Sequence, residues 1–145
     1  MKVLIQRVKN ARVDVEGKAV GQIKQGILAF VGVEKNDTKE STQRMLKKLL
    51  SYRIFSDDGG KMNLSVEDIN GEILLVSQFT LVANTKKGLR PSFSSAANPK
   101  LSEELYKYMI QQAKTTNLNI QTGVFAANMQ ISLVNDGPVT FNLEC

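Results

Sequence analysis

The chain has 145 residues, of which 42% are hydrophobic and 23% are charged, and its formal net charge is +5. These values fit one globular domain over residues 1–145, and no apolar run reaches the ~20 residues that a membrane-spanning helix needs. The chain has no histidine, which excludes the commonest general base, histidine-containing triads and most catalytic zinc sites.

Other features of composition bear on location and partners. Only three apolar residues separate Lys2 from Gln6, whereas a secretory signal needs about 7–15, so we expect a cytoplasmic protein. The single cysteine, Cys145, excludes an intramolecular disulfide and is poorly placed for a nucleophile, because chain termini fray. We expect no cofactor and no metal. The positive charge suits a polyanionic partner such as RNA.

The first elements along the chain are predicted to be strands. Alternation of apolar and polar residues predicts one strand near residues 3–8 and another over 12–16. A Glu-Gly-Lys turn at 16–18 then leads to a hairpin partner over 19–25. Residues 26–33 are almost continuously apolar, which is typical of a strand buried on both faces.

A helix is predicted next. Thr38 follows two other cap-forming residues, and apolar residues at helical spacing continue to about Tyr52. A turn over residues 56–61 follows, and residues 72–76 form another buried-strand run. Residues 83–98 are a polar loop, of a length that is usually functional or disordered.

Asn98 and Pro99 predict the start of a second helix, which ends near Lys114. Beyond it, the pattern predicts strands at residues 119–122, 125–134 and 139–143, with a turn at 135–138. The predicted fold is a single α+β domain, with a largely antiparallel sheet and two helices packed on it.

Two segments are candidates for chemistry. Ser77, Gln78, Phe79 and Thr80 place hydroxyl and amide groups at the end of a buried strand, where a rigid scaffold meets a loop. The alternative is that these side chains only bond the backbone of a turn. Residues 135–140 (NDGPVT) read as a tight turn, and base rates alone favour a trans bond before its proline.

Together, residues 77–81 (SQFTL) and 135–140 resemble the D-aminoacyl-tRNA deacylase family, also called the D-tyrosyl-tRNA deacylase family. The likeness runs in order from end to end, and no motif position departs from the family pattern. The further matching segments are residues 5–8, 32–35, 52–55, 60–64, 90–93 and 122–129.

The resemblance implies a barrel-like fold and a homodimer with its active sites at the subunit interface. It implies hydrolysis of the ester that joins a D-amino acid to the terminal adenosine of tRNA, and removal of glycine from alanine tRNA. It also implies that the Gly137–Pro138 bond is cis and enters the partner's pocket, where it occupies the space that an L side chain needs. A rigid clash of this kind discriminates between enantiomers that share every functional group.

The resemblance also assigns roles at the site. The ribose 2′-hydroxyl next to the ester would help to activate water, while backbone N–H groups of Phe79 and Thr80 stabilise the oxyanion. Ser77 and Gln78 would orient the adenosine or the amino acid. The alternative is a conventional hydrolase in which Thr80 is the nucleophile, although no base stands beside it in sequence. The predicted pocket residues are Phe125, Ala126, Ala127 and Met129, whose alternative interpretation is a plain core strand.

Lys86, Lys87 and Arg90 lie in the long loop after the motif and are candidates for contact with tRNA phosphates. The alternative is a solvated loop. A non-catalytic RNA-binding module is the remaining hypothesis for the whole chain; it predicts salt-dependent tRNA binding without ester hydrolysis.

Overall fold

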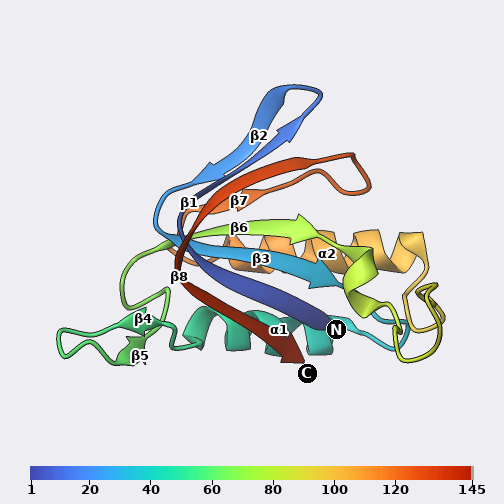
Figure 1. Ribbon diagram of the computed structural model, residues 1–145, viewed down its shortest axis with the longest axis horizontal. Coiled ribbons are helices and arrows are strands. Elements are labelled where there is room, and N and C mark those ends of the chain that lie inside the picture. The colour runs from blue at the N-terminus through green and yellow to red at the C-terminus, as the bar shows by residue number, and fades with distance from the viewer. Residues whose placement is uncertain (145) are drawn as a thin grey trace.

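One long strand organises the sheet in the computed structural model, which describes residues 1–144; the expectation for Cys145 lies outside them. β1 (Lys2–Val15) pairs antiparallel with β2 (Lys18–Ile23), β3 (Gly26–Gly32) and β8 (Gln130–Glu144). On the far side of β3, β6 (Glu72–Ser77) and β7 (Ile120–Thr122) continue the sheet in parallel (Figure 1). The six-stranded sheet is therefore mixed, with its antiparallel part centred on β1.

The sheet curls towards closure. β2 and β7 are not hydrogen-bonded neighbours, yet a Cβ built on Gly21 of β2 would lie 2.6 Å from the carbonyl oxygen of Thr122 in β7. Only a residue without a side chain allows that approach. The inside of the curl holds a small apolar cluster made by Val8, Leu28 and Val76 with their neighbours. The expected barrel-like α+β fold is confirmed.

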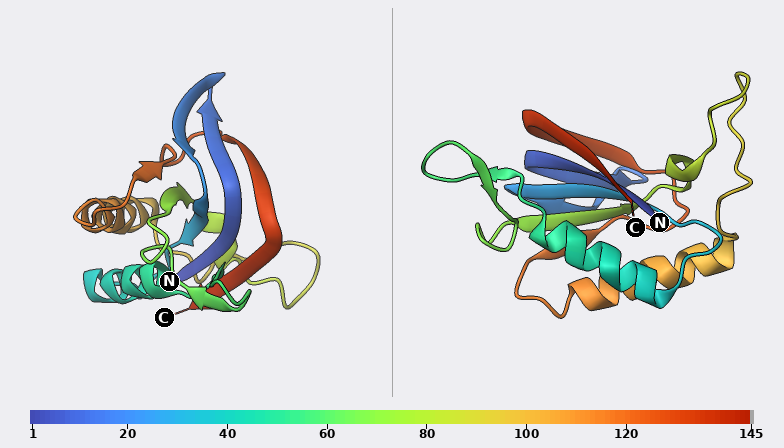
Figure 2. Two further views of the ribbon diagram at one scale, coloured as in Figure 1. Left: turned by 90° about the vertical axis from the view of Figure 1, so that its left-hand side faces the viewer. Right: turned by 90° about the horizontal axis from the view of Figure 1, so that it is seen from below.

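Two α-helices occur within residues 1–144, α1 (Lys39–Ser51) and α2 (Pro99–Ala113), and they cover one face of the sheet (Figure 2). Both begin where the caps predict: Thr38 and Ser41 form a capping box, and the Asn98 side chain accepts from the N–H of Leu101. The main apolar core lies between these helices and the sheet. No helix in the described part of the chain has the length and hydropathy needed to cross a membrane.

Between α1 and β6 the chain forms a small separate hairpin. β4 (Phe55–Ser56) pairs with β5 (Met62–Leu64). The turn predicted over residues 56–61 joins them, and Asp57 organises it by accepting from the N–H groups of Gly59 and Lys61.

Three predictions of local structure were wrong, and two of them have one cause. The strands expected at 3–8 and 12–16 are one strand, β1, and the turn and separate strand expected at 135–143 belong to β8. The ladder between β1 and β8 is irregular there, since Gln6 pairs with Thr140 while Val8 pairs with Asn135. Residues between Asn135 and Thr140 therefore bulge out of the ladder. A bulge interrupts the alternation of side chains, and the sequence pattern reads it as a turn.

The third correction concerns residues 125–134. Only Gln130 onward is strand, in β8. Residues 125–129 form a loop, in which Ala126 has a positive φ of 58°. Their apolar side chains line a pocket and do not belong to a strand.

Candidate active site

A pocket of about 490 Å³ lies at the C-terminal end of β6. Four parts of the chain form it: the end of β6, the loop at 125–129, the start of α2 and the start of β8. The lining residues are Val76, Ser77, Gln78, Phe79, Ala97, Pro99, Ser102, Phe125, Ala126, Ala127, Asn128, Met129 and Ile131.

The side chains described around the pocket are polar or apolar but not ionisable. Among residues 1–144, its lining contains no aspartate, glutamate, lysine, arginine or tyrosine. The polar groups that face it are hydroxyls, amides and backbone atoms. Such a lining positions a substrate and stabilises charge by hydrogen bonds, but it offers no side chain that works as a general base near neutral pH.

The fold explains how Ser77–Thr80 reaches the pocket. β6 is buried on both faces and hydrogen-bonds to β3 until the N–H of Gln78 donates to the carbonyl of Val31 at 2.8 Å. The chain then turns into a short 3₁₀ segment, η1 (Phe79–Val82), whose first residue is 61% exposed. The change from buried strand to exposed turn places Phe79 at the wall of the cavity.

The backbone of this turn has unused donors. The N–H of Leu81 donates to Gln78, but within residues 1–144 the N–H groups of Phe79 and Thr80 have no acceptor. The Thr80 hydroxyl accepts from the Gln78 side chain, and Thr80 does not line the pocket. Of the four predicted residues, Ser77, Gln78 and Phe79 line the cavity. Thr80 is exposed and does not line it.

The opposite wall contains Phe125, Ala126, Ala127 and Met129, so the structure brings the two predicted groups together. Sequence reasoning missed Ala97, Pro99, Ser102 and Asn128. Nothing in their local pattern marks a site, because the cap that starts α2 reads the same wherever a helix begins. Only the folding of α2 against the sheet places its first turn beside β6.

Gly137 and Pro138 lie elsewhere. Both are exposed in the bulge of β8, and neither lines the pocket of its own chain. The peptide bond between them is cis, and Gly137 has a φ of 135°. Arg7 holds this segment, because its Nε donates to the carbonyl of Asp136 at 2.9 Å and its Nη1 donates to the carbonyl of Ile54 at 2.6 Å.

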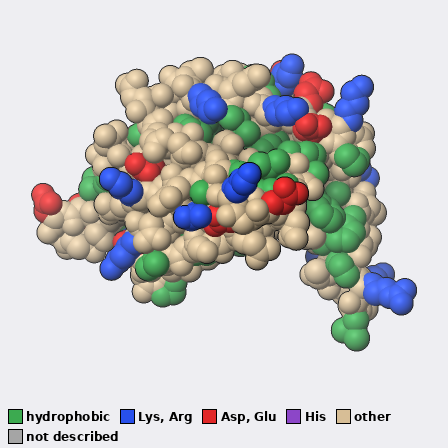
Figure 3. Space-filling view, turned by 90° about the horizontal axis from the view of Figure 1, so that it is seen from above, with side chains coloured by type: hydrophobic (Ala, Val, Ile, Leu, Met, Phe, Trp, Pro, Cys, Tyr) green, Lys and Arg blue, Asp and Glu red, His purple; other side chains and the backbone are tan. Residues whose placement is uncertain are grey.

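The loop over residues 83–98 projects from the body as an arm (Figure 2). Asn84 and Ser92 pair at its base, and Phe93 returns to pack on Phe79 with ring centroids 5.1 Å apart. Lys86, Lys87 and Arg90 are exposed on it. Basic and apolar side chains stand together at the far end of the arm in the space-filling view (Figure 3).

Comparison with known proteins identifies the family. Residues 4–144 match the profile of the family described as D-Tyr-tRNA(Tyr) deacylase. A protein of Pseudoalteromonas translucida named D-aminoacyl-tRNA deacylase is 59% identical over 99% of both chains, and one of Pseudomonas putida is 56% identical over the same share. The chain belongs to the D-Tyr-tRNA(Tyr) deacylase family. The expectation of a deacylase, a hydrolase of the aminoacyl-tRNA ester bond, is thereby confirmed.

Solved structures share the fold of this chain. A protein described as c-Myc DNA Unwinding Element Binding Protein superposes with a TM-score of 0.94 at 39% identity, covering 100% of this chain and 99% of that one. A probable eukaryotic D-amino acid tRNA deacylase superposes with a TM-score of 0.85 at 17% identity, covering 98% and 97%. The second likeness concerns the fold alone.

Proposed function

We propose that this chain is a cytoplasmic editing hydrolase that releases D-amino acids, and glycine carried by alanine tRNA, from the terminal adenosine of tRNA. The ester binds in the pocket at the end of β6. The terminal ribose 2′-hydroxyl assists the attacking water, and the protein supplies position and hydrogen-bond donors.

The observation that carries this proposal is that no ionisable side chain of residues 1–144 lines the pocket. Ester hydrolysis needs a proton acceptor for the attacking water and a donor to the developing oxyanion. The RNA hydroxyl is the remaining group next to the ester that can pass the proton. The N–H groups of Phe79 and Thr80 are free to stabilise the oxyanion. Ser77 and Gln78 then orient the adenosine or the amino acid.

The Thr80 side chain fits a supporting role better than a nucleophilic one. Its hydroxyl is hydrogen-bonded to the Gln78 amide, which cannot act as a base. A threonine hydroxyl without an activating base is a weak nucleophile. We assign Thr80 to holding Gln78 and to its backbone N–H.

Discrimination against L esters is assigned to Gly137 and Pro138 of a second subunit. The segment is exposed and does not line its own chain's pocket, so it reaches such a pocket only in another copy. The same strand, β8, exposes Val134 and Phe141, which is apolar surface that a homodimer would cover. A rigid segment in the space of the L side chain repels L esters and leaves glycyl esters unhindered.

Three substrates test the chemistry. We expect fast release from D-tyrosyl-tRNA, little from L-tyrosyl-tRNA, and a loss of about 100-fold when the tRNA ends in 2′-deoxyadenosine. Thr80→Ala should keep most of the activity, and Thr80→Ser serves as its conservative control. Equal rates on the two enantiomers would contradict the proposal, and near-complete loss in a folded Thr80→Ala protein would favour the nucleophile.

Subunit mixing tests the transfer of Gly137–Pro138 between chains. One variant keeps this segment but has a disabled pocket, through Phe79→Pro; the other keeps its pocket but carries Pro138→Ala. Co-refolding should restore sites that combine wild-type rate on the D ester with wild-type selectivity, a combination that neither homodimer has, because one site per mixed dimer is intact. No restoration, or a fully active monomer in light scattering, would place the segment's action within one chain.

A further inference from the structure

We propose that Tyr106 is a positioning residue for the pocket: its buried hydroxyl fastens the end of β6 where β7 has stopped, and its ring supports the Phe125 wall. This inference rests on the proposed function in one respect, since it takes the segment after β6 as the site of hydrolysis. Tyr106 lies in the middle of α2 and does not line the pocket, so it acts through other residues.

The need for such a residue follows from the lengths of the strands. β7 pairs with β6 only along Ile73–Leu75, and the last bond from this side runs from the N–H of Gly123 to the carbonyl of Leu75 at 2.9 Å. β6 continues through Val76 and Ser77, still paired with β3 on its other edge. The edge that faced β7 is therefore open just before Gln78. Buried backbone groups on such an edge need another partner.

Tyr106 supplies that partner. Its hydroxyl donates to the carbonyl of Leu75 at 2.8 Å, and the backbone of Ser77 lies beside the same phenol oxygen. The side chain is only 2% exposed. Burial raises the pKa of Tyr106, so the phenol stays protonated and remains a donor at any pH at which the ester survives. The Tyr106 hydroxyl thus contacts the edge of β6 at the point where pairing with β7 ends.

The ring of Tyr106 reaches the other wall. Its centroid lies 6.0 Å from that of Phe125, in a tilted arrangement. Phe125 lines the cavity opposite Ser77 and Gln78. Tyr106 therefore joins the two walls of the pocket through one rigid side chain, the hydroxyl holding one wall and the ring holding the other.

Loss of this hydroxyl should affect geometry more than folding. A neutral hydrogen bond contributes modestly to stability, whereas a small displacement of positioned groups is costly for a reaction that depends on orientation. In Tyr106→Phe the ring remains against Phe125 and the carbonyl of Leu75 keeps its bond from Gly123, but the phenol oxygen beside the backbone of Ser77 is lost. The disturbance is thus confined to the segment that leads into the site.

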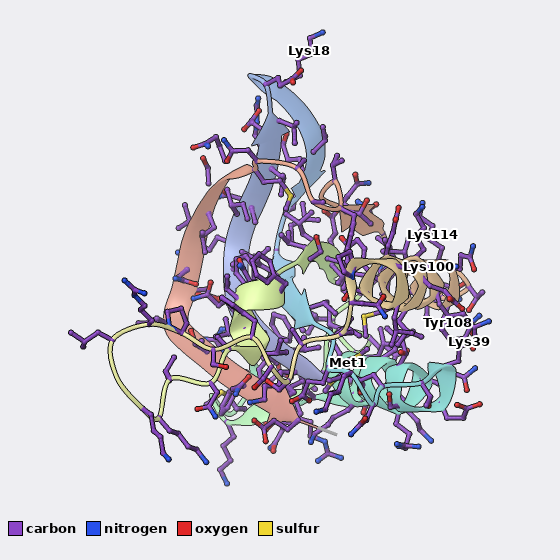
Figure 4. The ribbon with its side chains drawn as sticks, turned by 90° about the vertical axis from the view of Figure 1, so that its right-hand side faces the viewer. Met1, Lys18, Lys39, Lys100, Tyr108 and Lys114 are labelled. Atoms are coloured by element: carbon purple, nitrogen blue, oxygen red, sulfur yellow. The ribbon has the colours of Figure 1, made fainter. Side chains whose placement is uncertain are left out.

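Tyr108 provides a matched control. It is on the same helix, and its hydroxyl accepts from the Gln43 side chain in the contact between α1 and α2. It lies beside Lys39 on the outer surface of the helices (Figure 4), with the Lys39 ammonium 5.5 Å from its ring. Tyr108→Phe removes the same atom from the same helix without touching the pocket.

The experiment compares the two variants in two measurements. For Tyr106→Phe we expect kcat on D-tyrosyl-tRNA to fall roughly 3- to 10-fold with KM nearly unchanged, and amide hydrogen exchange at Ser77 to accelerate while exchange in the core of α1 does not. For Tyr108→Phe we expect neither change.

The outcomes separate this inference from the proposed function. Unchanged exchange at Ser77 in Tyr106→Phe would show that Tyr106 does not hold the end of β6. Faster exchange with unchanged kcat would show that this contact has no role in the reaction. An equal loss of kcat in Tyr108→Phe would mean a general effect of the helix and would also overturn this inference. If wild-type protein fails to hydrolyse the D ester while exchange at Ser77 still responds to Tyr106→Phe, the proposed function is wrong, but Tyr106 still positions the end of β6.

Discussion

The end of β6 and the bulge of β8 carry the two main sequence motifs, and they differ in burial and in how the sheet supports them. Ser77 follows four consecutive buried residues and pairs with Val31 of β3, and Tyr106 bonds the carbonyl of Leu75 two residues before it. Pro138 stands exposed on a strand that pairs only with β1, and there the ladder is interrupted. The first motif is built into the core of its own chain, and the second is displayed on the surface.

Under the proposed function, this difference corresponds to two separate roles. A segment that must hold a substrate within a few tenths of an ångström benefits from a buried scaffold. A segment that only has to exclude a side chain can come from a second subunit, provided that the segment is rigid. The two motifs should therefore respond differently to mutation: changes at the first should reduce the rate for every substrate, and changes at the second should alter selectivity.

The largest expected effect is from Phe79→Pro, which removes a backbone donor at the end of β6. We expect the rate on D-tyrosyl-tRNA to fall by about 100-fold or more, as when one oxyanion donor is lost. The fold should tolerate proline, since Phe79 opens a 3₁₀ turn and Gln78 has a non-helical φ of −144°. Single-turnover deacylation measures the effect.

Phe79→Ala is the matched control for this prediction. It keeps the N–H and removes the ring that packs on Phe93, so its loss of rate should be much smaller. If the two variants lose activity equally, the ring rather than the N–H is the important feature. The proposed oxyanion site would then be wrong.

The second prediction concerns selectivity at the bulge of β8. Pro138→Ala should raise the rate on L-tyrosyl-tRNA relative to the D ester by roughly tenfold, because a smaller and softer obstacle discriminates less. The rate on glycyl-tRNA should hardly change, since glycine has no side chain to exclude. Pro91→Ala, in the exposed arm, is the control and should leave the ratio unaltered. A loss of rate on all three substrates without a change in their ratio would assign Pro138 to binding or folding instead.

The sequence predicted the first of these regions better than the second. A continuous apolar run followed by Ser77 and Gln78 is local information, and the caps at Thr38 and Asn98 likewise mark both helices directly. The bulge around Gly137 was misread as a turn, because a bulge is defined by its pairing with a distant strand, and no local pattern reports that pairing.

The pocket itself was only half predictable. Phe125, Ala126, Ala127 and Met129 were assigned to the site by family resemblance, while their periodicity suggested a strand. Pro99 and Ser102 were missed, because their presence at the cavity depends on how α2 crosses the sheet. Tyr106 shows the same limit most clearly: at helical spacing it reads as an ordinary core residue, and its hydrogen bond to Leu75 spans 31 positions. Contacts of that range arise from tertiary structure, which residue patterns do not encode locally.

A smaller effect is expected from the arm, which belongs to neither motif. Replacing Lys86, Lys87 and Arg90 by alanine should raise KM roughly 3- to 10-fold and leave kcat nearly unchanged, if these side chains contact tRNA phosphates. The dependence of log KM on log salt should flatten by up to about two units. Lys47→Ala, on the outer face of α1, is the control. An unchanged salt dependence in the triple variant would mean that the arm is merely solvated.

The smallest expected effect on activity comes from Asp37→Asn, close to Glu34 and its bridge to Ala96 beside the pocket. Asp37 accepts from the Met1 amine at 2.8 Å and from the N–H of Glu34 at 2.7 Å, and Glu34 pairs with Ala96 next to the pocket. We expect a loss of about 2 kcal/mol in the free energy of unfolding, since bonds to a charged group are lost, with kcat within about twofold of wild type.

The pH dependence makes this last prediction specific. Burial lowers the pKa of the Met1 amine, but hydrogen bonds to Asp37 and Glu34 outweigh it, and the pKa is raised above 8.0. The ion pair's contribution to stability is therefore complete below pH 8.0 and is lost as the pH rises through the raised value. Urea unfolding well below and well above this pH should show the difference between wild type and Asp37→Asn shrinking in alkali. Asp58→Asn, in the exposed hairpin between β4 and β5, should show no such trend. If instead Asp37→Asn reduced kcat strongly at unchanged stability, the contrast would fail, because a remote ion pair would then act on the chemistry.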